Sequence, residues 1–185
     1  MNFSVSALQI PEVLVVRAKK FEDHRGYFME TWSQEVFSAF GVTASFVQDN
    51  ESQSRHAGTL RGLHFQRPPF EQAKLVRVLS GAVFDVAVDL RPSSPTFREW
   101  CAATLRVGEQ LYVPRGFAHG FVTLEPNTIV TYKVDALYAP RSEAGIRWND
   151  PCLAIDWPVD PSSIILSEKD GRLPSFSEVF SQPAV

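Results

Sequence analysis

The stretch GEQLYVPRGFAH, residues 108–119, decides the fold of this 185-residue chain. Gly108 supplies a turn, the residues after it suit a strand, and Pro114 with Gly116 turns the chain again just before His119. In a barrel of short strands, this order aims the histidine into the interior. The stretch therefore predicts a β-structure in which His119 lines a cavity.

The segment from Lys74 to Leu90 alternates like the strands of such a barrel. In KLVRVLS, residues 74–80, Lys74, Val76 and Val78 share one face, and the residues between them share the other. The alternation resumes after Ser80 and Gly81, in AVFDVAVDL. We expect a β-hairpin here, turning at these two residues.

Most of the remaining patterned segments also predict strands. They are EVLVVRAKKF (12–21), CAATLRV (101–107), EQLYVP (109–114), HGFVTL (119–124) and TIVTYKVDALY (128–138). Helices are expected only from Ser33 to Gly41, with Ser33 as N-cap, and near Phe176 to Phe180. The sequence thus predicts an all-β sandwich or barrel with a few short peripheral helices, in a single domain of residues 1–185.

Composition excludes several classes of partner. The net charge of −3 and pI near 5.8 give no global attraction to nucleic acid or to an anionic membrane. No apolar run approaches the roughly 20 residues of a membrane-spanning helix, and the N-terminus has no basic start. Cys101 and Cys152 form no paired motif. We expect a soluble, cytoplasmic protein with reduced thiols.

Residues 108–119 also match every fixed position of the second signature of the cupin family, G-x5-P-x-G-x2-H. The match implies a cupin-type jelly roll, also called a double-stranded β-helix. Metal-binding cupins supply an H-x-H pair earlier in the chain, because a divalent ion needs three or four convergent ligands. Here the corresponding residues are His64, Phe65 and Gln66, so no metal and no cofactor is expected.

Each polar residue that we expect near His64 can be explained singly by structure alone, without a function. A lone histidine is usually a satisfied core or turn residue, Tyr132 and Tyr138 suit any strand, and Arg25 suits a solvated turn. Lys74 is different, since it opens a strand on the apolar face, where a buried ammonium needs an anionic partner or ligand. The combination of Lys74 with His64 favours a functional cavity.

Seven blocks of the sequence, in this order and spacing, resemble the dTDP-4-dehydrorhamnose 3,5-epimerase family. They are DHRGYFMETW, FVQDNESQS, TLRGLHFQ, QAKLVRVLSGAVFDVAVDLRPSSPTF, VPRGFAHGF, TYKVDALYAPRSEAGIRWNDP and LSEKD, and they cover the chain from about Gln9 to about Pro174. The resemblance implies a metal-free homodimer with exchanged N-terminal strands and a short C-terminal extension. It also implies the inversion of C3 and C5 of dTDP-4-dehydro-6-deoxyglucose.

The resemblance assigns four catalytic roles. His64 resembles the base that removes a proton next to the C4 ketone, and Asp170 the carboxylate that orients this histidine. Lys74 resembles the cation that faces the developing oxyanion, and Tyr132 the acid that returns a proton on the opposite ring face. Retention of Tyr132 favours inversion at both carbons.

The resemblance also assigns the residues that bind the substrate. Arg25, Arg61 and Lys169 match positions that hold the nucleotide diphosphate, for which a guanidinium fork is well suited. Phe28 and Tyr138 suit stacking on the thymine. The other matching positions are Glu30, Gln48, Asn50, His119 and Glu143.

Three alternatives remain open on the sequence. Relatives with the same base invert a single centre or isomerise the keto sugar. A cupin that binds sugar nucleotides without catalysis would not need a paired base and acid. A metal-dependent oxygenase or isomerase would need a third ligand beyond His64 and His119. One departure concerns a turn alone, since Arg98 stands where the family often has glycine.

Overall fold

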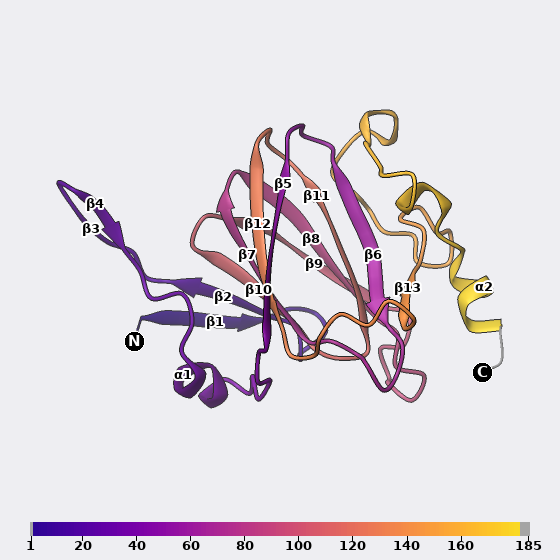
Figure 1. The fold of residues 1–185 in the computed structure, drawn as a ribbon, viewed down its shortest axis with the longest axis horizontal. Helices are drawn as coiled ribbons and strands as arrows, with labels where there is room; N and C mark the ends of the chain where they lie inside the picture. Colours follow the sequence, from indigo (N-terminus) through magenta and orange to yellow (C-terminus); the bar gives the residue numbers. More distant parts are fainter. Residues whose placement is uncertain (1, 182–185) are drawn as a thin grey trace.

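The computed structural model describes residues 2–181, which form two facing antiparallel sheets (Figure 1). The six-stranded sheet has the order β1-β2-β10-β7-β12-β5, with bounds Phe3–Ala7 (β1), Leu14–Ala18 (β2), Glu109–Val113 (β10), Lys74–Ser80 (β7), Thr128–Val134 (β12) and Gln48–Ser54 (β5). The five-stranded sheet has the order β13-β6-β11-β8-β9, with bounds Glu143–Gly145 (β13), Leu60–Gln66 (β6), Phe117–Thr123 (β11), Ala82–Asp89 (β8) and Trp100–Arg106 (β9). The predicted all-β jelly roll is confirmed. Met1 and residues 182–185 of the predicted domain lie outside the described residues.

The predicted hairpin between Lys74 and Leu90 is wrong. Both strands form, but β7 pairs with β10 and β12, whereas β8 pairs with β9 and β11 in the facing sheet. Gly81, with a φ of 78°, stands alone between the two strands and carries the chain across the sandwich. A side chain there would collide with Thr128. The alternation of side chains is the same for both connections, so it could not distinguish them.

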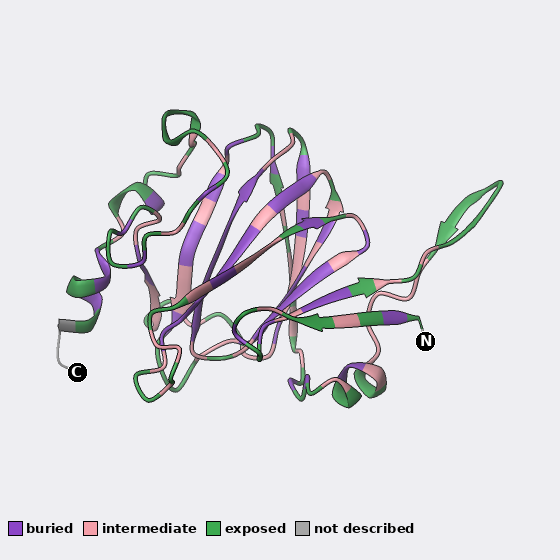
Figure 2. Ribbon diagram, turned by 180° about the vertical axis from the view of Figure 1, so that it is seen from behind, coloured by how far each residue is buried: buried purple, intermediate pink, exposed green. Residues whose placement is uncertain are grey.

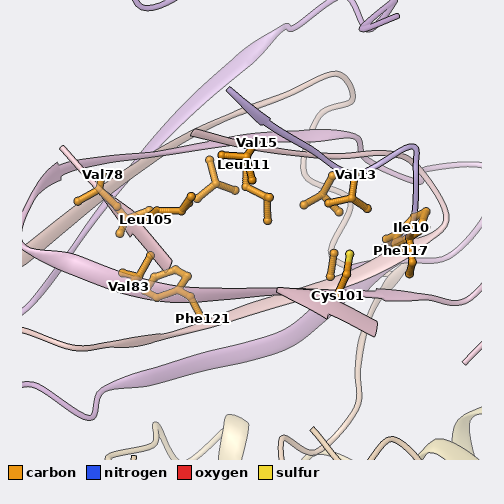
Figure 3. Packing of buried hydrophobic residues seen from close by; sticks show 14 residues of the cluster. Ile10, Val13, Val15, Val78, Val83, Cys101, Leu105, Leu111, Phe117 and Phe121 are labelled. Carbon is orange, nitrogen blue, oxygen red and sulfur yellow. The ribbon is translucent and has the colours of Figure 1, made fainter. Parts of the chain in front are cut away.

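The predicted faces of these strands are confirmed by the core. Val76 and Val78 point inward and pack against Val83 and Ala87 from the opposite sheet, together with the buried residues shown in Figure 3. On the outer side of β8, Val86 and its neighbours pack beneath the C-terminal segments. Buried residues follow the strands through the middle of the molecule in Figure 2.

Short helices close the outside of the sandwich. The first, α1 (Gln34–Ala39), is capped by the Ser33 hydroxyl, which accepts a hydrogen bond from the Val36 amide, and it buries Phe37 against the six-stranded sheet. The second, α2 (Phe176–Ser181), follows two 3-10 turns, η1 (Pro161–Ser163) and η2 (Asp170–Arg172). Both helices were predicted. No helix among residues 2–181 is long and apolar enough to cross a membrane.

A small hairpin projects from the N-terminal end of the molecule (Figure 1). It consists of β3 (Phe21–Asp23) and β4 (Gly26–Phe28), which pair only with each other. All six strand residues are exposed, and the Phe28 side chain is 69% exposed. We call residues 21–28 the arm. Lys19 and Lys20 lie over the rings of Phe21 and Tyr27, but within residues 2–181 no other strand pairs with the arm.

Candidate active site

The interior of the sandwich is apolar at one end and polar at the other. The strand register produces this arrangement: His119 on β11 lies opposite His64 on β6, and Tyr132 on β12 lies opposite Asn50 on β5. Both sheets therefore direct polar side chains into one cavity of about 260 Å³. The cavity is lined by Gln48, Asn50, His64, Phe65, Gln66, Gln72, Lys74, Tyr132, Tyr138 and Glu143.

His64 forms a pair with Asp170, a residue 106 positions away in the chain. Its Nε2 atom lies 2.6 Å from a carboxylate oxygen of Asp170, and the two side chains are 32% and 6% exposed. Burial alone would raise the pKa of Asp170, but hydrogen bonds from His64, Ser167 and the Gly62 amide outweigh burial and lower it. The ionised carboxylate holds the proton of His64 on Nε2, which leaves Nδ1 as the basic nitrogen.

The chain can bring His64 to this place because Gly62 and Gly120 let β6 and β11 approach closely. Gly62 has a φ of 126°, and a Cβ atom there would lie 2.6 Å from Gly120 Cα. The register between the two strands shifts at this point. Only glycine tolerates both the conformation and the contact.

Lys74 is a buried cation at the start of β7, with 8% of its surface exposed. Burial lowers its pKa to about 8, against the opposing attraction of Asp85 and Glu143. An ammonium in this environment can lose or keep its proton within the physiological range. It is also a strong source of positive potential, because little water screens it.

Tyr132 lines the same cavity from β12. Burial raises the pKa of its phenol, and the nearby positive charge of Arg61 only partly offsets this effect. The phenol is therefore protonated and can donate a proton. Arg61 itself is held against β5 by the Ser54 hydroxyl and the Gln53 carbonyl, at 3.3 and 3.0 Å.

Glu143 joins two of the predicted substrate-binding residues. One of its oxygens accepts a hydrogen bond from the Tyr138 hydroxyl at 2.8 Å, and the other lies 2.6 Å from Lys169 Nζ. Burial alone would raise the pKa of Glu143, but these two partners lower it. The acid therefore fixes an aromatic ring and a cation at the rim of the cavity.

Sequence reasoning assigned no role to three polar residues at the site, Gln66, Gln72 and Asp85. Gln66 stands where metal-binding cupins have a second histidine, and it is used to hold two loops together. Its amide donates to the carbonyls of Phe70 and Leu137 and accepts from the Ala139 amide, at 2.6, 3.3 and 2.7 Å. Gln72 donates to the Ala136 carbonyl at 2.7 Å, and Asp85 lies 2.5 Å from His119 Nε2. The sequence distinguished Gln66 only as a departure from the H-x-H pair, and no pattern distinguished Gln72 or Asp85.

Three predicted site residues do not reach the cavity within one chain. Arg25 and Phe28 belong to the arm, and Glu30 follows it and accepts a hydrogen bond from Asn2. The guanidinium of Arg25 is paired with its neighbour Asp23 instead. His119 does not line the cavity itself but lies opposite His64, and Arg61 is bonded to Ser54 and Gln53 beside it. The remaining predicted residues line the cavity or contact a residue that does.

Within residues 2–181, no group of at least three His, Cys, Asp or Glu side chains is arranged to hold a metal ion. His64 and His119 are neighbours, yet each places its Nε2 atom against an aspartate. The two histidines therefore belong to two histidine–aspartate pairs.

Comparison with known proteins places this geometry in one family. The family profile of dTDP-4-dehydrorhamnose 3,5-epimerase matches residues 7–178. A curated protein of that name from Sinorhizobium fredii is 49% identical over 175 residues, which cover 94% of this chain and 89% of the relative.

Solved structures agree in fold as well as in sequence. A dTDP-4-dehydrorhamnose 3,5-epimerase from Bacillus anthracis, with TDP and PPi bound, has a TM-score of 0.90 at 48% identity and covers 94% of this chain and 99% of its own. A dTDP-6-deoxy-D-glucose-3,5-epimerase from Legionella pneumophila, in complex with dTDP-4-keto-L-rhamnose, has a TM-score of 0.91 at 41% identity, with coverage of 97% and 95%. This chain therefore belongs to the dTDP-4-dehydrorhamnose 3,5-epimerase family.

Proposed function

We propose that this protein inverts C3 and C5 of dTDP-4-dehydro-6-deoxy-D-glucose to give dTDP-4-dehydro-L-rhamnose, a step toward dTDP-L-rhamnose. The ligands of the two solved relatives, TDP with PPi and dTDP-4-keto-L-rhamnose, support this substrate class. Both reacting carbons flank the C4 ketone, so loss of either proton gives an enolate with its charge on the C4 oxygen. The reaction needs a base, an oxyanion stabiliser and an acid.

The observation that carries the proposal is the pair of His64 and Asp170 in one cavity with Lys74 and Tyr132. Nδ1 of His64 is the base that takes the proton from C3 or C5. The Asp170 carboxylate keeps the ring in the required tautomer and stabilises the imidazolium that forms.

Lys74 and Tyr132 complete the reaction. The Lys74 ammonium stabilises the oxyanion at C4, where a preorganised charge is worth several kcal/mol. The Tyr132 phenol returns a proton to the enolate carbon on the face opposite His64, so the configuration inverts. The raised pKa of Tyr132 keeps the phenol protonated until the strongly basic enolate is formed.

The substrate's nucleotide is bound at the rim. Arg61 and Lys169 supply positive charge for the diphosphate, and Tyr138, held by Glu143, offers a ring for the thymine. Gln48, Asn50 and His119 face the sugar hydroxyls as hydrogen-bonding groups. Local basic residues thus bind a dianionic ligand on a chain of net negative charge.

The arm implies a dimer in which each copy completes the other's site. Arg25 and Phe28 lie outside the cavity of their own chain, and the arm exposes Phe21, Tyr27 and Phe28. The outer edge of β5 also lacks a neighbouring strand within residues 2–181. An exposed edge and an arm with three exposed aromatic rings favour exchange between two copies, which would bring Arg25 to the diphosphate and Phe28 to the thymine.

The two free thiols, Cys101 and Cys152, are compatible with a reducing compartment. We therefore place the reaction in the cytoplasm. Burial raises the pKa of Cys101 to about 11, so this thiol stays protonated and takes no part in catalysis.

The test is proton NMR of dTDP-4-dehydro-6-deoxyglucose incubated with the protein in heavy water. We expect solvent deuterium at both C3 and C5, and none with His64→Asn, which leaves a smaller polar side chain and removes the base. Exchange at C3 or C5 alone would make the protein a single-centre epimerase. Binding of dTDP without any exchange would leave a binding protein and overturn the proposal.

A further inference from the structure

Asp85 is a buried acid beneath the catalytic cavity to which no function has yet been given. It lies on β8 and is 0% exposed, on the inward face shared with Val83 and Ala87. One carboxylate oxygen, Oδ1, contacts His119 Nε2 at 2.5 Å. The other, Oδ2, is also buried and accepts no hydrogen bond from any residue among 2–181. A buried carboxylate with a free oxygen is costly unless a positive charge lies close by.

The nearby positive charge is Lys74. Lys74 on β7 and Asp85 on β8 belong to the two facing sheets, and each lies on the inward face of its own sheet. Burial lowers the pKa of Lys74, and the negative charges of Asp85 and Glu143 raise it again. The effect of Asp85 is the larger of the two. Glu143 is already shared with Tyr138 and Lys169 at the rim. Within residues 2–181, the one side-chain hydrogen bond of Asp85 is that with His119.

We propose that Asp85 is a positioning residue of the active site, which keeps the Lys74 ammonium protonated and fixes the ring orientation of His119. The proposal rests on the proposed function, since it assigns Asp85 an effect on the oxyanion stabiliser of that reaction. With Asp85 ionised, the proton of His119 stays on Nε2 and its Nδ1 atom is left as an acceptor for a substrate hydroxyl.

The titration of Lys74 depends on all the ionisable groups around it. These are His64 and Arg61 from β6, Asp85 from β8, His119 from β11, Tyr132 from β12, Tyr138 from the following loop and Glu143 from β13. Only Asp85 and Glu143 among them attract the ammonium as its opposing charges. If the charge of Asp85 is removed, less attraction remains to offset the effect of burial on the pKa of Lys74. Lys74 then loses its proton at a lower pH.

The direct test is an NMR titration of Lys74 in protein labelled with ¹³C at the lysine Cε, with the signal assigned by Lys74→Gln. In Asp85→Asn, which retains the size of the side chain, we expect the midpoint to fall by about one pH unit or more. Asp85→Ser, which is smaller and cannot clash, should give the same shift. The matched control is Asp89→Asn on the same strand, where the acid is equally buried but bonded to Arg91; its Lys74 midpoint should not move.

A second readout is the pH profile of deuterium exchange into the substrate. The alkaline limb should move to lower pH in Asp85→Asn by the same amount as the NMR midpoint, and the activity lost near neutral pH should return on acidification. An unchanged midpoint in folded Asp85→Asn would overturn the inference, as would failure of both Asp85 variants to fold. If the wild type exchanges no protons, the proposed function fails, yet the NMR titration still tests the electrostatic inference.

Discussion

His64 and His119 lie directly opposite each other across β6 and β11, and each contacts an aspartate from a different part of the chain. Asp170 approaches His64 from the C-terminal turn η2, where the ring is partly open to solvent. Asp85 approaches His119 from the neighbouring strand β8, where both side chains are buried. The same chemical pair thus occurs once at the surface of the cavity, where we propose that it transfers protons, and once beneath it.

The first prediction concerns the surface pair. Asp170→Asn preserves the size of the side chain but removes the charge that holds the proton on Nε2 of His64. We expect kcat to fall about 10³- to 10⁴-fold with little change in KM. Steady-state kinetics at several pH values would measure this. A fall of less than about tenfold would show that His64 needs no orienting carboxylate.

The second prediction separates proton removal from inversion. Tyr132→Phe deletes the acid but leaves His64 and Lys74 in place. We expect deuterium to enter the substrate from the His64 face while the yield of inverted sugar falls at least about 100-fold. NMR can follow exchange and configuration in the same sample. Equal losses of exchange and of inversion would assign Tyr132 to the proton-removal step instead.

The third prediction concerns the arm. A heterodimer of a His64→Asn chain and an Arg25→Ala chain can be purified with two affinity tags after coexpression. If arms are exchanged, one site receives both an intact His64 and the partner's intact arm, and the heterodimer has about half of wild-type activity. If Arg25 serves its own chain, both sites are defective and no activity above that of the Arg25→Ala homodimer appears.

The fourth prediction concerns the close approach of β6 and β11. Gly62→Ala places a methyl group 2.6 Å from Gly120 Cα in a backbone with φ of 126°, so we expect a loss of about 3 kcal/mol or more in unfolding free energy. Gly171→Ala is the control, since its methyl group would meet open space. Urea denaturation compares the two. Equal midpoints for both variants would contradict the expected clash.

The fifth prediction concerns stability at acid pH. Burial alone would raise the pKa of Asp89, but hydrogen bonds from Arg91, Ser94 and Thr96 lower it from 3.8 to about 2. The ionised carboxylate therefore stabilises the fold by about 2 kcal/mol above pH 4, and this contribution disappears as the pH falls toward 2. Asp89→Asn should be less stable than wild type at neutral pH, with the gap closing on acidification. A gap that is constant with pH in urea titrations would rule out this origin.

Much of the fold could be predicted because a strand with one buried face alternates apolar and polar residues. The inward faces of residues 74–90, the cap at Ser33 and the turn before His119 were all predicted correctly. The assignment of β7 and β8 to different sheets was not predicted, because a chain that crosses the sandwich at Gly81 has the same alternation as a hairpin. The polar strand β5 was also missed, because QDNESQS carries no apolar period.

Some residues of the candidate site could likewise be predicted from the sequence, and others could not. His64, Lys74 and Tyr132 were identified because their matching motifs carry chemical types that the reaction requires, and the structure brings them to one cavity. Asp85 was not identified, because a single acidic residue in a strand does not reveal which residues lie opposite it in the facing sheet. Arg25 lies outside the cavity of its own chain, and its proposed place in the site rests on exchange of the arm with a second copy.

Gln66 has a consequence for how the cavity admits its ligand. By bonding Phe70 on one loop and Leu137 and Ala139 on another, its amide ties both loops to the end of β6. We expect these three hydrogen bonds to keep the two loops at a constant spacing on this side of the cavity. The scaffold itself would then set the width of the opening there, through a side chain to which we assign no catalytic role.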